Sequence, residues 1–141
     1  CRGRAFNLIK DHPNELNPNK RPLHTIIPAM LSDNDKLIGS FGVMGGQYQA
    51  AGHAYVLSQM IDFGLSPQQA LDFPRVFPNN NILDFENKFD KDVIDDLALR
   101  GHEINHLAPP IGGGQMILID NGRDVLIGAS DWRKDGLAIG Y

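Results

Sequence analysis

Hydrophobic and polar residues follow one another along the chain in a pattern that predicts short strands separated by a few helices. Apolar runs over residues 23–31 and 36–39 flank a polar turn at 32–35, which predicts a hairpin. Pro28 has no amide donor, so we expect the first of these strands at a sheet edge or at a bulge. Residues 1–22 are polar and contain three prolines, which is typical of an extended lead-in that lies on another surface.

The longest helix is predicted over residues 48–63, where no charge occurs before Asp62. A helix that is apolar nearly all round is expected to be buried between a sheet and other elements. His53 lies inside it, and we expect a neutral, hydrogen-bonded core histidine rather than a catalytic base, because no partner is identifiable in the sequence. The predicted buried face comprises Ala50, Ala54, Leu57 and Ile61, widened by Ala51, Tyr55 and Met60.

The second half of the chain alternates further helices with strands. Ser66 and Pro67 are N-cap and N1 signals for a short helix, and Asp90 and Gly101 mark the ends of another. The dipeptide 121–122, Asn-Gly, is the strongest hairpin signal in the chain. The remaining predictions are an Asn-rich turn at 79–81 and strands at 82–86, 102–106, 115–119 and 125–128.

A glycine-rich stretch between the hairpin and the long helix carries the candidate chemistry. Residues 39–47 read GSFGVMGGQ, and the four glycines allow a sharp turn with positive φ angles. At a helix start such a turn presents unpaired N–H groups to an anion or to an oxyanion that forms during a reaction. We favour the oxyanion. The alternative, that the glycines only allow close packing, stays open. A nucleotide-binding loop is disfavoured, because the Lys-Ser/Thr ending of a phosphate loop is absent and the glycine spacing does not give G-x-G-x-x-G followed by an acidic ribose partner.

Composition limits the remaining function classes. The 141 residues, 42% of them hydrophobic, suffice for one α+β domain spanning 1–141. A net charge of −4 argues against nucleic acid as a partner, and no apolar run approaches the roughly 18 residues of a membrane span. The single cysteine, Cys1, excludes an internal disulfide; we expect it to mark an arbitrary chain start rather than a terminal nucleophile. The sequence leaves the compartment open.

Other polar groups are expected to be structural. His102 and His106 have i, i+4 spacing, but Gly101 and the following prolines argue against a helix there, so no metal site is expected. Asp84 and Glu86 are expected on the solvated surface. A short-range ion pair between residues 131 and 133 is expected to shape a loop. We expect neither a cofactor nor a metal.

Several short motifs, taken in order over nearly the whole chain, resemble the small subunit of the γ-glutamyltranspeptidases. The residues that carry the resemblance are Lys20-Arg21-Pro22, Pro28, Gly45-Gly46, Asp62-Phe63-Gly64, Ala70, Pro74-Arg75, Glu86, Gly101-His102, Ala129-Ser130-Asp131, Arg133 and Gly140-Tyr141.

The resemblance implies an N-terminal-nucleophile hydrolase fold, the C-terminal portion of an αββα sandwich formed from a self-cleaving precursor. It implies a threonine nucleophile, which we expect to precede this chain, and as partners the large subunit and the remainder of the small subunit. Gly45 and Gly46 map onto the glycine pair whose amides bind the oxyanion in that family. The substrate would be a small-molecule γ-glutamyl or related amide.

The chain departs from the family pattern at substrate-binding positions. The two adjacent serines that bind the substrate α-carboxylate are here His24 and Thr25, and the residue after the glycine pair, usually serine, is Gln47. The aspartate that binds the α-amino group is replaced by Ala5, with two arginines nearby. The resemblance therefore implies a divergent branch whose acyl donor need not be an ordinary γ-glutamyl compound.

Three functions stay open at this point. The first is a γ-glutamyltransferase or hydrolase in which this chain supplies the oxyanion hole and the wall of the acyl pocket. The second is an amidase or β-lactam acylase with the same fold. The third is a member of the family that has lost catalysis and serves as a binding module.

Overall fold

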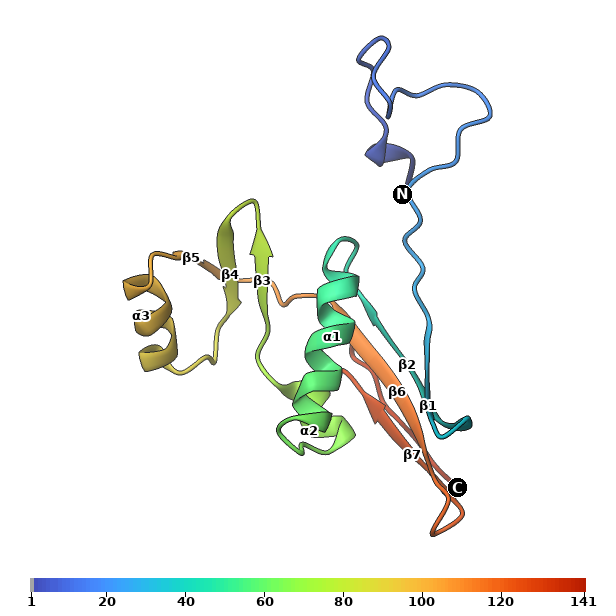
Figure 1. Cartoon of the computed structure of the whole chain (residues 1–141). Coiled ribbons are helices and arrows are strands. Elements are labelled where there is room, and N and C mark those ends of the chain that lie inside the picture. The colour runs from blue at the N-terminus through green and yellow to red at the C-terminus, as the bar shows by residue number, and fades with distance from the viewer. Residues whose placement is uncertain (1) are drawn as a thin grey trace.

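The computed structural model describes residues 2–141, so the expectation for Cys1 lies outside the described residues. Two sheets, three α-helices and an N-terminal lead-in make up residues 2–141 (Figure 1). The elements are η1 (Arg2–Ala5), β1 (Ala29–Asp33), β2 (Lys36–Met44), α1 (Tyr48–Ile61), α2 (Pro67–Asp72), β3 (Val76–Asn79), β4 (Ile82–Glu86), α3 (Lys91–Leu99), β5 (Glu103–Leu107), β6 (Gly113–Asp120), β7 (Val125–Ser130) and η2 (Trp132–Lys134).

The larger sheet contains four antiparallel strands in the order β1-β2-β6-β7, and α1 and α2 pack on one of its faces (Figure 1). Phe41 of β2 pairs with Met116 of β6, which pairs with Ala129 of β7. These three side chains share the face toward the helices because side chains alternate along a strand. With Val56 and Leu71 from the helices they belong to the buried core.

Turn chemistry explains how several strands connect. The two-residue loop Asn34-Asp35 between β1 and β2 has φ angles of 47° and 62°. Asn80 and Asn81, between β3 and β4, have φ angles of 50° and 67°. Positive φ at both central positions matches the right-handed twist of the flanking strands, and asparagine and aspartate tolerate it. The predicted Asn-rich turn is therefore confirmed.

The predicted first strand is wrong in its N-terminal half. Residues 23–28 are extended but unpaired, and β1 begins at Ala29, directly after Pro28. As expected, this strand lies at the edge of the sheet, and its register shifts between Leu31 and Ser32. The following strand is longer than predicted, because residues 39–44 continue β2 instead of forming the turn.

The orientation of α1 also differs from the prediction. The helix buries Tyr48, Gln49, Gly52, Val56 and Gln59. Of the residues expected to be buried, Ala50 and Ala54 are exposed, and Ile61 is 75% exposed. Two glutamines, Gln49 and Gln59, are thus buried at positions that the hydrophobic pattern does not indicate.

A smaller sheet of strands β3, β4 and β5 lies beside the larger one and carries α3 (Figure 1). Strands β3 and β4 are antiparallel, whereas β4 and β5 are parallel and are joined by α3. Asp90 caps that helix through the Asp92 amide, and Gly101 follows it with φ 94°, so both predicted ends are confirmed.

The lead-in projects away from both sheets before the extended segment brings the chain to β1 (Figure 1). It contains η1 and a single bridge between Asn7 and Glu15. Within residues 2–141 no helix is both long and apolar enough to cross a bilayer.

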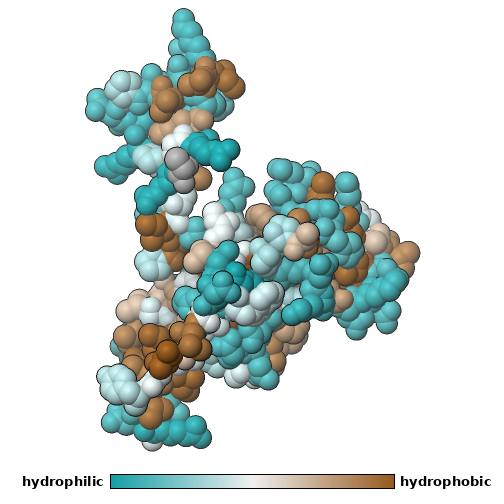
Figure 2. Space-filling view, turned by 180° about the vertical axis from the view of Figure 1, so that it is seen from behind, coloured by the Kyte–Doolittle hydropathy of each residue, from teal (hydrophilic) through white to brown (hydrophobic). Residues whose placement is uncertain are grey.

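The face of the larger sheet that α1 and α2 leave uncovered is rich in hydrophobic side chains (Figure 2). Met30 on β1, Ile117 on β6 and Leu126 on β7 are 67%, 51% and 69% exposed. Strand register places them on one side, since Met30 pairs with Ser40, which pairs with Ile117. The described residues therefore supply helices for only one side of this sheet.

Candidate active site

The glycine turn occupies only residues 45–47, between the end of β2 and the start of α1. Gly45 has φ 138° and Gly46 has φ 61°, angles that side-chain-bearing residues rarely adopt. The Tyr48 amide donates to the Gly45 carbonyl at 3.1 Å, and the Gln49 amide donates to the Gly46 carbonyl at 3.2 Å. The turn therefore satisfies the first donors of the helix with its own carbonyls.

The amides of the turn itself are open. Gly45 and Gly46 are exposed, and neither amide donates to any acceptor within residues 2–141. Gln47 is the N-cap, and its side chain makes no capping bond. Bare amides at a helix start carry partial positive charge and can bind an anion or a developing oxyanion. Their catalytic role stays a prediction.

The Tyr48 side chain lies next to both Gly45 and Gly112, between the turn and the segment that leads into β6. Its hydroxyl is buried and has no partner among the described residues. Burial raises the pKa of Tyr48 to about 12, because the phenolate would lose its hydration. The phenol therefore stays protonated at neutral pH, which excludes Tyr48 as a general base there.

Gly112 forms the other support of the turn. It has φ 64°, and a Cβ at this position would overlap the Met44 carbonyl oxygen and lie 3.0 Å from the Tyr48 ring. A Cβ on Gly45 would in turn lie 3.2 Å from the Gly112 Cα. The two backbone segments thus approach so closely that position 112 has no room for a side chain, and a side chain at position 45 would force its neighbours to shift.

Gln49 connects the turn to one of the predicted substrate-binding residues. Its Nε2 donates to the Thr25 carbonyl at 2.6 Å and to the Gly46 carbonyl at 3.2 Å. Thr25 is half-buried beside the turn, whereas His24 and Gln47 are exposed and make no side-chain hydrogen bond within residues 2–141. The structure therefore brings Thr25 and Gly46 close to the same side chain. Gln49, which makes this connection, was not among the site residues predicted from the sequence.

His53 is bonded to its own helix, as the sequence predicted. Its Nδ1 lies 2.6 Å from the Gln49 carbonyl oxygen, and its ring lies 5.0 Å from that of Phe41. Because a carbonyl only accepts, Nδ1 carries the proton. The buried Nε2 has no partner in the described part of the chain.

A buried ion network lies behind the turn. Arg75 and Asp131 are fully buried and are joined at 2.6 Å, and Arg133 binds Asp131 at 3.2 Å. Arg133 also holds both oxygens of Glu86, with its Nε 2.7 Å from Oε1 and its Nη2 2.5 Å from Oε2. The predicted structural pair of residues 131 and 133 is confirmed.

The expectation that Glu86 lies on the surface is wrong, and so is that for Asp84, which two asparagines hold within the smaller sheet. Glu86 is 5% exposed and Asp84 is 7% exposed, and the side chains of Asn79 and Asn105 donate to Asp84. Burial alone would raise the pKa of the Glu86 carboxyl, but Arg133 and the Ile111 and Arg75 amides outweigh burial and hold that pKa below its usual value. Burial alone would lower the pKa of Arg133, but the carboxylates of Glu86 and Asp131 outweigh it and raise that pKa above its usual value.

The network holds the segment that supports the glycine turn. The Ile111 amide donates to Glu86 at 2.6 Å, and the Ile111 carbonyl accepts from Arg75 Nη1 at 2.7 Å. The Gly114 amide donates to Asp131 Oδ2 at 2.7 Å. Residues 111 and 114 are thus fixed on either side of Gly112, which touches the turn.

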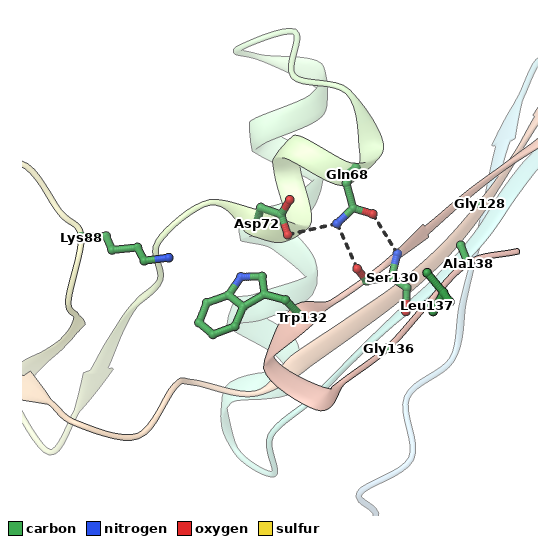
Figure 3. A pocket seen from close by; sticks show the side chains of 9 residues that line it. All are labelled: Gln68, Asp72, Lys88, Gly128, Ser130, Trp132, Gly136, Leu137 and Ala138. Atoms are coloured by element: carbon green, nitrogen blue, oxygen red, sulfur yellow. Dashed lines mark hydrogen bonds between the residues drawn. The ribbon is translucent and has the colours of Figure 1, made fainter.

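The polar hollow shown in Figure 3 contains none of the predicted site residues. It has a volume of about 550 Å³ and lies between α2, the end of β7 and residues 136–138. Gln68 and Ser130 both line this hollow. The Gln68 side chain donates to the Ser130 carbonyl at 2.9 Å and accepts from the Ser130 amide at 3.1 Å (Figure 3). Lys88 Nζ and the Arg133 guanidinium each lie 4.8 Å from the centre of the Trp132 ring.

Metal ligation has no support in the described residues. His106 lies on β5, and His102 precedes that strand, so the spacing does not place the two on one helical face. No group of three or more potential ligands occurs within residues 2–141.

Comparison with known proteins identifies similar chains. A family model described as Gamma-glutamyltranspeptidase matches residues 2–141. A glutathione hydrolase-like proenzyme of Bacillus subtilis is 32% identical over 99% of this chain, and an oxamate amidohydrolase proenzyme of Klebsiella pneumoniae is 33% identical over 99%. The crystal structure of a cephalosporin acylase from Bacillus halodurans is 43% identical, with a TM-score of 0.86 over 99% of this chain and 27% of that one. The chain spans 28% of the length of each of the two proenzymes.

Proposed function

The chain belongs to the gamma-glutamyltranspeptidase family, and on that premise we propose that it forms part of an enzyme that cleaves an amide by acyl transfer. Membership confirms the resemblance inferred from the motifs. The structural likeness confirms the fold class, an α+β N-terminal-nucleophile hydrolase. The activity belongs to a longer protein, of which this chain would supply the oxyanion hole and part of the substrate pocket.

The observation that carries the proposal is the pair of open amides at Gly45 and Gly46. They lie at the start of α1, where the helix dipole favours negative charge. In a tetrahedral intermediate the substrate carbonyl oxygen becomes an anion, and two preorganised N–H groups stabilise it more than they stabilise the neutral carbonyl. This difference lowers the barrier to acylation.

The nucleophile would come from a part of the protein outside this chain, and the family resemblance implies a threonine at a newly formed N-terminus. Its oxygen attacks the amide carbonyl and its proton passes to the α-amine. The intermediate collapses, the C–N bond breaks, and the leaving amine takes up the proton. Water, or an acceptor amine, then attacks the acyl ester and releases the acid or a new amide.

The acyl donor is a γ-glutamyl compound or a related amide. A second candidate, an amidase or β-lactam acylase activity, is favoured by the departures at Ala5 and His24. The relatives named above differ in their names, which are a glutathione hydrolase-like proenzyme, an oxamate amidohydrolase proenzyme and a cephalosporin acylase. Loss of the family's acidic residue at position 5 removes the group that would bind an α-ammonium.

The partner is the remainder of the same precursor. The uncovered face of the larger sheet, with Met30, Ile117 and Leu126, would pack against a second sheet, as an αββα sandwich requires. The N-terminal lead-in would also lie on that remainder of the precursor. Relatives of this chain are proenzymes, which accords with subunits produced from one precursor.

A matched pair of substrates tests the proposal in the complete, processed protein. γ-Glutamyl p-nitroanilide and glutaryl p-nitroanilide differ only by the α-ammonium group. We expect release of p-nitroaniline, with a faster reaction on the glutaryl compound, because Ala5 offers no carboxylate to the ammonium. Preference for the γ-glutamyl compound would favour the γ-glutamyltransferase or hydrolase over the amidase or acylase candidate. No release from either these or other acyl anilides by a fully processed protein would support the inactive binding module and overturn the proposal.

A further inference from the structure

The geometry points to Gln49 as a positioning residue that fixes the extended segment of residues 21–28 against the glycine turn. The inference rests on the proposed function, because it assigns to Gln49 the alignment of an acyl group with the amides of Gly45 and Gly46. It also makes a claim about the chain itself, which can be tested without substrate.

The contacts of Gln49 account for both hydrogens of its side-chain amide. One contact is with the Thr25 carbonyl and the other with the Gly46 carbonyl, at 2.6 and 3.2 Å. The residue is 6% exposed, so water does not compete freely for these bonds. A single NH₂ group thus joins two backbone positions that lie 21 residues apart in sequence.

The extended segment has little else to hold it. It forms no strand, and Leu23 and Ile26 are 55% and 57% exposed. Within residues 2–141, the bond from Gln49 is the only hydrogen bond that involves any residue from 21 to 28. The path of this segment past the turn therefore depends on one side chain.

Gln49 is itself well placed to transmit position. It lies in the first turn of α1, where its amide is bonded to Gly46 and its carbonyl accepts from His53 Nδ1 at 2.6 Å. The backbone of Gln49 is therefore fixed to the turn, and its side chain reaches from there to Thr25. If the side chains of residues 24 and 25 bind the acyl group, Gln49 sets the distance from that group to the oxyanion amides.

The test compares two identical substitutions on the same helix, in the complete processed protein. Gln49→Met removes the two donors while keeping an unbranched side chain of similar size. Gln59→Met is the control, because Gln59 is 7% exposed on the same helix and its side chain makes no hydrogen bond within residues 2–141. We expect Gln49→Met to lower kcat/KM by about 10²-fold, with KM raised and kcat lowered, since a displacement of about 1 Å costs that much. Gln59→Met should stay within about threefold of wild type.

Limited proteolysis with a protease of broad specificity provides the second readout, which needs no activity. In Gln49→Met the peptide bonds within residues 23–27 should be cleaved faster than in wild type, because the segment is no longer held at the Thr25 carbonyl, while cleavage within α1 should stay unchanged. In Gln59→Met neither cleavage rate should change. If Gln49→Met does not accumulate as folded protein, Gln49→Glu carries the same test, and its deficit relative to wild type should shrink as lower pH protonates the carboxyl and restores one donor.

The outcomes separate this inference from the proposed function. Unchanged proteolysis over 23–27 together with unchanged kcat/KM in the Gln49 variant overturns the positioning role while leaving the enzyme proposal intact. Faster proteolysis in a protein whose wild type cleaves no acyl anilide supports the structural connection and overturns the enzyme proposal. Equal losses in the Gln49 and Gln59 variants also overturn the positioning role, because they would reflect helix packing alone.

Discussion

Gly112 lies so close to Gly45 that a Cβ on either residue would crowd backbone atoms of the other segment. The Cα of Gly112 would be 3.2 Å from a Cβ built on Gly45, and a Cβ on Gly112 would overlap the Met44 carbonyl oxygen. The position of the oxyanion amides thus depends on the segment that leads into β6, since Gly112 lies 67 residues after Gly45.

Gly112→Ala should displace the glycine turn and lower both activity and stability. Gly64→Ala is the matched control, because Gly64 has φ 68° against 64° for Gly112 but has nothing within 4 Å of its Cβ position. The control should lose only about 1–2 kcal/mol, the cost of a positive φ angle for alanine. We expect a larger fall in Tm for Gly112→Ala and a fall in kcat that the control lacks. Equal effects in the two variants would show that the close approach is unimportant.

Substitution of Gly46 should distinguish amide orientation from simple bulk. Its φ of 61° is tolerated by asparagine but is strained for a β-branched residue, and a Cβ there meets nothing within 4 Å. Gly46→Val should turn the amide away and lower kcat by about 10²–10³-fold, the effect of losing one oxyanion donor. Gly46→Asn should retain much more activity. If steady-state kinetics give the same loss for both, the side chain blocks the substrate and the amide argument fails.

Breaking the buried ion network should cost far more than breaking an exposed pair. Arg75→Met removes the shorter of the two arginine contacts of the fully buried Asp131, leaving only Arg133 beside it, and should destabilise the protein by about 3–5 kcal/mol. Arg100→Met removes an exposed pair with Asp96, whose side chains are 68% and 57% exposed, and should cost less than about 1 kcal/mol. Denaturant unfolding of the two variants measures this difference. Similar midpoints would mean that the network does not hold the fold.

Stability should fall at acidic pH through Glu86. The pKa of this carboxyl is lower in the folded protein than its ordinary value of 4.5, so the folded state favours the ionised form. Its contribution is therefore fully present above about pH 4.5 and is lost as the pH falls through the lower, folded-state pKa. In thermal unfolding between pH 7 and pH 3, the difference in Tm between wild type and Glu86→Gln should narrow toward the acidic end. A difference that is constant with pH would contradict this assignment.

The sequence predicts the elements that depend on local chemistry. Ser66 is the N-cap expected of it, with its hydroxyl accepting from the Gln69 amide, and the Gln69 side chain completes a capping box by accepting from the Ser66 amide. The glycine pair before the long helix adopts the positive φ angles that its composition indicates. These features are decided by residues a few positions apart, so a single sequence is enough to identify them.

The features that were missed depend on partners distant in sequence. Gln49 is buried because its side chain bonds to Thr25, 24 residues away, and the hydrophobic pattern of α1 cannot reveal such a bond. Arg75 meets Asp131 across 56 residues, and Glu86 meets Arg133 across 47. A charged residue is ordinarily solvated, so without knowledge of its partner the surface is the correct expectation. The surface expectation for Glu86 was therefore wrong. Ala50, Ala54 and Ile61 of the predicted helix face were also placed wrongly, whereas Ala51, Leu57 and Met60 pack against the core as expected.

Gln68 has a consequence for how molecules of this protein meet one another. Its carboxamide pairs with both the N–H and the C=O of Ser130, as an adjoining strand would. Ser130 lies at the end of β7, the outermost strand of its sheet, where unsatisfied backbone groups invite another chain to add on. One glutamine side chain thereby occupies the point at which a foreign strand could begin to pair, which guards the sheet against self-association at that end.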